Sequence, residues 1–112
     1  MKLLIVGTRG ILNFDLSPYV TSDVDTIISG GSSGIDTLAE QYADAHALSK
    51  YIIRPQYQIY GRFAPLKRNE IMVDMTDAVL AVWDGTSRGT KYTINYAKRV
   101  NKPVTVVVID IV

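Results

Sequence analysis

Short apolar runs recur along this chain, and segments with helical spacing separate them. Continuous runs without polar alternation are typical of strands that are buried on both faces of a sheet. Strands joined through helices pair in parallel, with right-handed crossovers that place helices on both faces. The pattern therefore predicts a single α/β domain over residues 1–112. The predicted strands are Leu3 to Val6, Thr26 to Ile28, Tyr51 to Ile53, Ala78 to Trp83 and Val104 to Ile109, with Tyr51 to Ile53 at an edge because it stops at Arg54-Pro55.

Four helices are predicted between these strands. The clearest begins at Ile35, where apolar residues follow the spacing of one helical stripe as far as His46. Ser17 followed by Pro18 resembles a helix N-cap and a first helical residue, which predicts a short helix there. The other two begin near Pro65 and at about Thr90, and Gln56 to Ala64 is predicted to be one long irregular loop.

Charge and composition narrow the classes of partner. The net charge is +1 at pH 7, which does not favour non-specific binding to nucleic acid or to an anionic membrane. The chain has no cysteine, which removes disulfides, thiolate metal sites and cysteine nucleophiles, so we expect no metal site. The first apolar run is too short for a signal sequence or a membrane span, and we expect a cytoplasmic protein.

Loops rich in glycine, serine and threonine follow three of the predicted strands. Gly7-Thr8-Arg9-Gly10 follows the first, Ser29-Gly30-Gly31-Ser32-Ser33-Gly34 the second and Asp84-Gly85-Thr86-Ser87-Arg88-Gly89-Thr90 the fourth. Parallel strands end at the same edge, and open α/β sheets bind ligands beyond that edge. We therefore expect these loops to converge on one site.

The segment from Gly30 to Gly34 has the strongest physical case, because it joins a buried strand directly to an amphipathic helix. Glycines allow a tight turn and a close backbone approach, and free N–H groups at a helix start attract an anion such as phosphate. Ser32 and Ser33 offer hydroxyl donors, whereas Asp36 fits a helix-start residue better than a ligand contact. A plain tight turn explains the same glycines equally well.

Other candidates lie on the later loops and on the third helix. Gly89-Thr90 starts the last helix with Ser87 nearby, while Asp84 fits either a ribose contact or a turn-initiating aspartate. Arg68 shares a helix face with two methionines, which favours an inward guanidinium that could bind a phosphate or a carboxylate. Arg9, directly after the first strand, is similar.

Aromatic residues offer a second kind of contact. Trp83 ends a predicted strand, and Tyr57 and Tyr60 lie in the predicted long loop. Such rings can stack on a base, but at a strand end or in a loop they more often complete a core. We expect these three to be core residues.

These residues together resemble the SLOG superfamily of Rossmann-like nucleotide binders, which includes the Lonely Guy phosphoribohydrolases and the DNA-processing protein A family. The likeness is closest to its small single-domain YspA- and YpsA-like branch. The matching stretches are Gly7-Thr8-Arg9, Gly30-Gly31-Ser32-Ser33-Gly34-Ile35-Asp36 with Leu38-Ala39, Arg68-Asn69-Glu70-Ile71-Met72 and Gly89-Thr90. The resemblance implies a Rossmann-like three-layer α/β/α fold with a five-stranded parallel sheet in the order 3-2-1-4-5. It also implies a nucleotide or ADP-ribose derivative lying across the loops, with Arg68 and Asn69 bordering that pocket.

The last loop departs from the enzymes of that superfamily. Lonely Guy enzymes carry a Pro-Gly-Gly-x-Gly-Thr-x-x-Glu signature whose glutamate serves N-glycosidic cleavage, and Thr93 stands where that glutamate would be. A threonine cannot act as a general base at neutral pH, nor stabilise an oxocarbenium-like centre, as a carboxylate can. Glu40 and Glu70 are weak candidates to replace it, and each fits an ordinary helix residue as well.

Three functions follow from this reading. The first is binding of a nucleotide or nucleotide-derived ligand by a sensor or binding module, and the second is hydrolysis of the N-glycosidic bond of a nucleoside 5′-monophosphate. The third, binding of single-stranded DNA, is disfavoured because such sites need a positively charged groove. The resemblance is also compatible with a homodimer. The ligand-binding residues expected for the first function are Gly7, Thr8, Arg9, Gly30, Gly31, Ser32, Ser33, Gly34, Arg68, Asn69, Asp84, Gly85, Ser87, Gly89 and Thr90.

Overall fold

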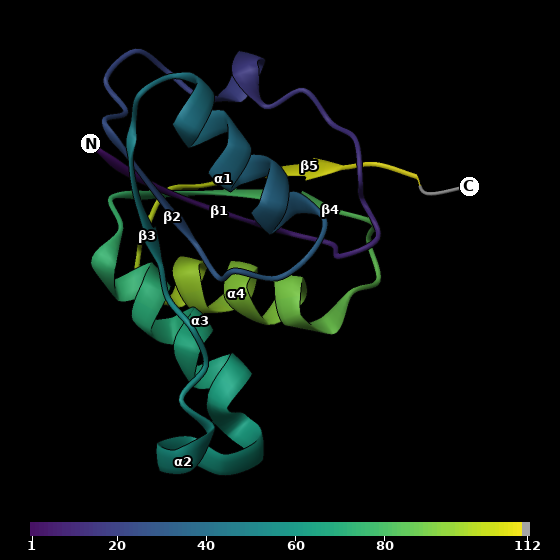
Figure 1. The fold of residues 1–112 in the computed structure, drawn as a ribbon. Coiled ribbons are helices and arrows are strands. Elements are labelled where there is room, and N and C mark those ends of the chain that lie inside the picture. Colours follow the sequence, from purple (N-terminus) through teal and green to yellow (C-terminus); the bar gives the residue numbers. More distant parts are fainter. Residues whose placement is uncertain (111–112) are drawn as a thin grey trace.

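Five parallel strands form one sheet in the order β3-β2-β1-β4-β5, as Figure 1 shows. The order is the one predicted. β1 lies at the centre and pairs with both β2 and β4, and its residues Leu3 to Val6 are buried. The computed structural model describes residues 1–110, and its strands are β1 (Lys2–Gly7), β2 (Thr26–Ser29), β3 (Ser49–Ile52), β4 (Ala78–Trp83) and β5 (Val104–Val108).

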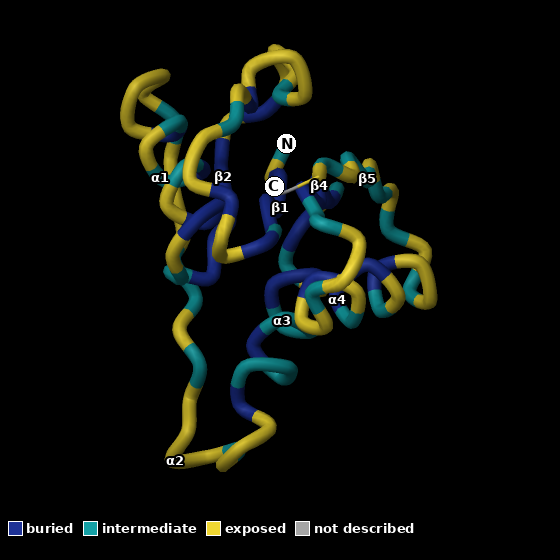
Figure 2. Tube along the Cα trace, turned by 90° about the vertical axis from the view of Figure 1, so that its right-hand side faces the viewer, coloured by how far each residue is buried: buried dark blue, intermediate teal, exposed yellow. Residues whose placement is uncertain are grey.

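Helices cover both faces of this sheet (Figures 1 and 2). α1 (Ile35–Ala45) packs on one face, where it meets Leu3 and Ile5 of β1. α3 (Ala64–Met75) and α4 (Arg88–Arg99) pack on the other face, where they meet Leu4 and Val6. Alternate residues of β1 therefore point to opposite layers, as the pleat requires. The result is the predicted Rossmann-like three-layer α/β/α fold.

The short helix predicted at Ser17-Pro18 is present, but two other local predictions are wrong. Ser17 is not an N-cap: it lies inside the 3₁₀ helix η1 (Ser17–Tyr19), and its hydroxyl donates to the Asp15 carboxylate at 2.6 Å. The segment from Gln56 to Ala64 is not an irregular loop. It contains α2 (Tyr57–Tyr60) and the 3₁₀ helix η2 (Gly61–Phe63), which leads directly into α3.

The expectation that β5 is buried on both faces is also wrong. β5 pairs only with β4 and forms an edge of the sheet. Thr105 and Val108 are exposed, and the other residues of β5 are only partly buried. Its valines match the composition of a central strand, but the sheet order leaves this strand with one neighbour.

The connection from β3 through α2 to α3 projects from the body of the domain (Figures 1 and 2). Its large apolar side chains Tyr57, Ile59 and Phe63 are exposed. Tyr57 is therefore not the core residue that was expected. Trp83, by contrast, does pack against the core on the α3 and α4 face.

Gly7 sets how closely α1 approaches the centre of the sheet. A Cβ atom added at Gly7 would lie 2.3 Å from the Val82 carbonyl oxygen and 2.6 Å from Cγ1 of Ile35. Both neighbours are fully buried, so neither can move aside cheaply. This contact lies at the carboxyl end of β1, where the loops begin.

We expect Gly7→Ala to lower the free energy of unfolding by about 2–3 kcal/mol, because the added methyl group overpacks this contact. Gly89→Ala is the matched control: its Cβ would meet nothing within 4 Å, and alanine is the better helix former. Urea unfolding midpoints measure both effects. Equal midpoints for the two variants would contradict this role of Gly7.

Candidate functional site

A cavity of about 400 Å³ opens at the carboxyl edge of the sheet. The chain runs from β1 outward to β2 and β3 on one side and from β4 to β5 on the other, so the strand order reverses between β1 and β4. This is the place where open α/β sheets bind ligands. We call it the central cavity, and its lining residues are Val6, Gly7, Thr8, Arg9, Gly10, Ser32, Asp36, Arg68, Asn69, Met72, Ser87, Gly89, Thr90 and Thr93.

A second cavity of about 250 Å³ lies beside the first. It shares Arg9, Ser32 and Arg68 with the central cavity, so these three residues separate the two spaces. We call it the arginine cavity, and its remaining lining residues are Gly30, Gly31, Ser33, Arg54, Pro55, Tyr57 and Pro65.

The three predicted loops do converge at this edge, although not every predicted residue reaches a cavity. Gly30, Gly31 and Ser33 line the arginine cavity, whereas Gly34, Asp84 and Gly85 line neither. The other predicted residues line the central cavity, and they are Gly7, Thr8, Arg9, Ser32, Arg68, Asn69, Ser87, Gly89 and Thr90.

Arg68 is buried between the two cavities, with 6% of its surface exposed. Its Nη1 donates to the carbonyl oxygens of Gly30 at 2.6 Å and Ile53 at 3.2 Å, and its Nε donates to Asn69 Oδ1 at 2.8 Å. The Nη2 of Arg68 has no hydrogen-bond partner among residues 1–110. Because every buried side-chain nitrogen or oxygen in this range has a partner, Nη2 is accessible to solvent. The inward orientation predicted for Arg68 is therefore confirmed, and part of its guanidinium remains available.

Asp36 places a carboxylate at the start of α1 and at the wall of the central cavity. Its Oδ2 accepts the Ser32 N–H at 3.1 Å, as expected of a helix-start residue. Burial raises the pKa of the Asp36 carboxyl, while the Ser32 N–H and the Arg68 charge act in the opposite direction. The Gly31 N–H is also used, since it donates to Ser29 Oγ at 3.3 Å. The Gly30 to Gly34 loop thus has fewer free N–H groups than its sequence indicates.

The start of α4 is arranged differently, because its carboxylate, Asp84, lies in the loop before the helix. The Asp84 carboxylate accepts the N–H groups of Thr86 at 2.9 Å and Ser87 at 2.8 Å, together with the Ser87 hydroxyl at 3.0 Å. These hydrogen bonds lower the pKa of Asp84 to about 2. This geometry favours the turn-initiating interpretation of Asp84 over the ribose contact.

Because Ser87 gives its hydroxyl to Asp84, it does not cap α4 with its side chain. Ser87 Oγ also lies 3.2 Å from Thr8 Oγ1, which accepts the Asp84 N–H at 3.1 Å, so this network joins the loops after β1 and β4. The first N–H engaged inside α4 is that of Lys91, which donates to the Ser87 carbonyl oxygen. The N–H groups of Arg88, Gly89 and Thr90 have no acceptor among residues 1–110, and Gly89 and Thr90 line the central cavity.

Neither proposed catalytic glutamate reaches a cavity. Glu40 accepts the Ser29 hydroxyl at 2.8 Å, and Glu70 accepts the Tyr92 hydroxyl and pairs with Lys67 at 3.6 Å. Thr93 does line the central cavity, where it donates to the Gly89 carbonyl oxygen at 3.0 Å. Within residues 1–110, Asp36 is the one carboxylate that lines either cavity.

The sequence analysis did not name Arg54, it expected Tyr57 in the core instead of at a cavity, and it did not place Asp36 in a cavity. Arg54 follows β3, so it lies at the same sheet edge as the three loops, and its position after a strand was a usable signal. Tyr57 gave no comparable signal, because its place depends on the turn of α2. Asp36 reaches the cavity because the start of α1 is held against the loop after β1: the Thr8 carbonyl oxygen accepts the Ile35 N–H at 3.5 Å.

The fold and its cavities define a Rossmann-like α/β protein with an open pocket at the topological switch of the sheet. The chain is similar to the uncharacterised SPbeta prophage-derived protein YoqJ of Bacillus subtilis strain 168, with 37% identity over 65 residues. That match covers 55% of this chain and 37% of YoqJ, so the chain spans little more than a third of that relative. No protein-family model matches the sequence, and no solved structure matches it. None of the helices within residues 1–110 is long and apolar enough to cross a membrane.

Asp84 makes the stability of this loop depend on pH. Its pKa in the folded protein, about 2, lies below the ordinary value of 3.8, so its contribution is complete above about pH 4 and is lost as the pH falls through 2. We expect Asp84→Ala to be less stable than the original chain at pH 7, with a difference that shrinks as the pH falls from 4 towards 2. Denaturant unfolding across this pH range measures the difference, and a constant difference would contradict the assignment.

Proposed function

We propose that the protein binds a nucleotide or nucleotide-derived ligand in the central cavity, as a sensor or binding module. The observation that carries the proposal is the start of α4, where the N–H groups of Gly89 and Thr90 have no acceptor among residues 1–110 and both residues line the cavity. A helix start attracts anions through these groups and through the helix dipole. Arg9 and Arg68 line the same cavity and add positive charge. A phosphate group is the anion that this arrangement fits.

The rest of the central cavity suits a sugar and a base. Thr8, Ser87 and Thr90 bring hydroxyl groups to its wall, while Val6 and Met72 add apolar surface. A volume of about 400 Å³ lies within the ordinary range of small-molecule sites, about 300–1,000 Å³. The resemblance to SLOG proteins points to the same class of ligand.

Gly89→Asp tests the phosphate position directly. An aspartate there would have room for its Cβ, and its carboxylate would interact favourably with the helix dipole. The same negative charge would repel a phosphate. We expect a bound nucleotide at 100 times its dissociation constant to stabilise the original chain by about 2.7 kcal/mol, and this gain to be lost in Gly89→Asp. Thermal unfolding with nucleoside mono-, di- and triphosphates, NAD and ADP-ribose measures the gain.

Asn95→Asp is the matched control, because it makes the same charge change at an exposed position of α4 that lines neither cavity. It should keep the full ligand effect. Trp83 gives a second readout: it is the chain's one tryptophan, and its indole N–H donates to the Ser87 carbonyl oxygen at 3.0 Å. A thermal gain that is identical in both variants, or no gain with any nucleotide, would contradict the proposal.

Asp36 supports a second candidate function, hydrolysis of the N-glycosidic bond of a nucleoside 5′-monophosphate. It is buried in the cavity wall, and its raised pKa suits a group that gives a proton to a leaving base. Glu40 and Glu70, which line neither cavity, are less suitable for this role.

If the protein is a hydrolase, Asp36→Asn should lower the release of free base by at least about a hundredfold, since general acid–base catalysis contributes about 10²–10⁴-fold. Nucleotide binding should persist, because an asparagine oxygen can still accept the Ser32 N–H. Chromatography of the free base measures turnover. Glu70→Gln serves as the control, and unchanged turnover in Asp36→Asn would exclude the role.

A further inference from the structure

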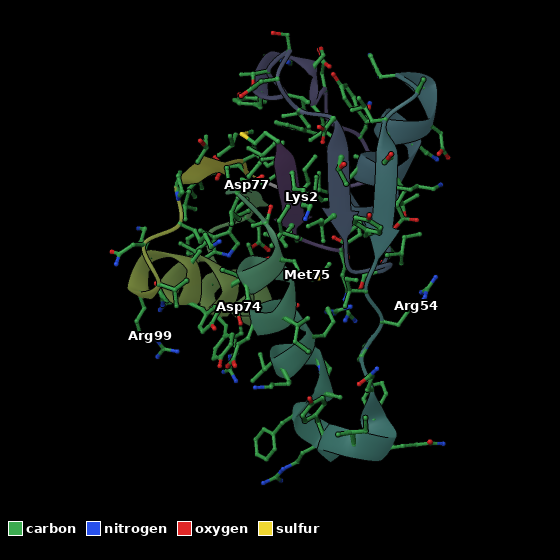
Figure 3. The ribbon with its side chains drawn as sticks, turned by 90° about the vertical axis from the view of Figure 1, so that its left-hand side faces the viewer. Lys2, Arg54, Asp74, Met75, Asp77 and Arg99 are labelled. Carbon is green, nitrogen blue, oxygen red and sulfur yellow. The ribbon has the colours of Figure 1, made fainter. Side chains whose placement is uncertain are left out.

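Three arginines from different elements line the arginine cavity. Arg9 comes from the loop after β1, Arg54 from the segment after β3 (Figure 3) and Arg68 from α3. No acidic residue lines this cavity, and among residues 1–110 no carboxylate oxygen lies within 4 Å of any of their guanidinium groups. Like charges that gather without a counter-charge repel one another. Within the described chain, none of the three arginines therefore forms an ion pair.

Two of these groups are held in place. Arg68 is buried and bonded to the carbonyl oxygens of Gly30 and Ile53. Arg54 has an exposed side chain, yet its Nη1 donates to the Gly31 carbonyl oxygen at 3.1 Å. A Cβ atom at Gly31 would lie 2.7 Å from that Nη1, and Gly31 adopts a φ of +75°. A glycine at this position thus lets the guanidinium lie against the loop instead of extending into solvent.

The charges of Arg9 and Arg54 both act on Arg68. Burial lowers the pKa of Arg68 and the charge of Asp36 raises it, while the charges of Arg9 and Arg54 lower it further. Asp36 faces the central cavity, however, and does not line the arginine cavity. An anion in the arginine cavity would relieve this repulsion. Guanidinium groups bind phosphate oxygens through paired N–H donors, which makes phosphate the matching anion.

The two cavities are close enough for one molecule to occupy both, because Arg9, Ser32 and Arg68 line each of them. Tyr57, Pro55 and Pro65 add an aromatic and apolar wall to the arginine cavity. We propose that the arginine cavity is a second phosphate subsite and that the ligand is a nucleotide with two separate phosphate groups. One phosphate lies at the start of α4 and the other lies among Arg9, Arg54 and Arg68. This inference rests on the proposed function, which places the first phosphate.

The test compares the 5′-monophosphates and the 3′,5′-bisphosphates of adenosine, guanosine, cytidine and uridine by isothermal titration calorimetry. For at least one base we expect the bisphosphate to bind about tenfold or more tightly than the monophosphate, as a charge-assisted phosphate contact would provide. Arg54→Gln should abolish this difference and leave the monophosphate affinity unchanged. Arg54 suits the test because its side chain is exposed and it lines only the arginine cavity.

Arg62→Gln is the matched control, since Arg62 is an exposed arginine of η2 that lies over the Phe63 ring and lines neither cavity. It should leave both affinities unchanged. If monophosphates bind but the second phosphate adds nothing, or if both variants weaken binding alike, the second subsite is overturned and the proposed function stands. If no nucleotide of either series binds, both proposals are overturned.

Discussion

A guanidinium group that leaves water must find hydrogen-bond acceptors, and Arg68 finds them at the ends of two strands. The carbonyl oxygen of Gly30 follows β2, and that of Ile53 follows β3. Arg68 itself belongs to α3, so one side chain ties this helix to the carboxyl edge of the sheet. The hydrogen bond from Arg68 Nε to Asn69 Oδ1 further fixes the orientation of the guanidinium group. Both cavities depend on this position, because Arg68 forms part of the wall between them.

The two helices that begin at this edge differ in their electrostatic character. α1 begins with its own carboxylate, since Asp36 lies in its first turn and accepts a loop N–H. α4 begins without a side-chain cap, because Asp84 binds the loop before the helix and engages the Ser87 hydroxyl. A negative ligand is therefore less favoured at α1, where the carboxylate lies inside the first turn, than at α4, where it precedes the helix. The chain contains two glycine-rich helix starts of similar composition, and their local hydrogen bonding differs.

The fold could be predicted from the sequence because strand and helix periodicities alternate clearly along it. The exceptions have physical causes. β5 has the apolar composition of a buried strand, but burial depends on the number of neighbouring strands, which composition does not record. The single turn of α2 is too short to show a helical period. The convergence of three loops followed from strand direction alone, since parallel strands end at one edge.

The details of the site could not be predicted in the same way. The two carbonyl acceptors of Arg68 lie 38 and 15 residues away in the chain, so they come within reach only once β2, β3 and α3 have assembled. The free N–H groups of α4 depend on which side chain Ser87 contacts, and a run of glycine, serine and threonine does not reveal that. The place of Arg54 at this edge could have been predicted, because Arg54 follows the edge strand β3 at the same spacing as Arg9 follows β1.

The most direct test of the central claim is a nuclear magnetic resonance titration of the ¹⁵N-labelled protein with a nucleoside 5′-monophosphate that binds. Backbone N–H groups that donate to a phosphate shift most, so the spectrum locates the anion residue by residue. We expect the largest amide shifts at Arg88, Gly89 and Thr90, with small shifts at Asp36 and Thr37. Largest shifts at Asp36 and Thr37, or shifts spread evenly over the chain, would contradict the assignment of α4 as the phosphate-binding helix.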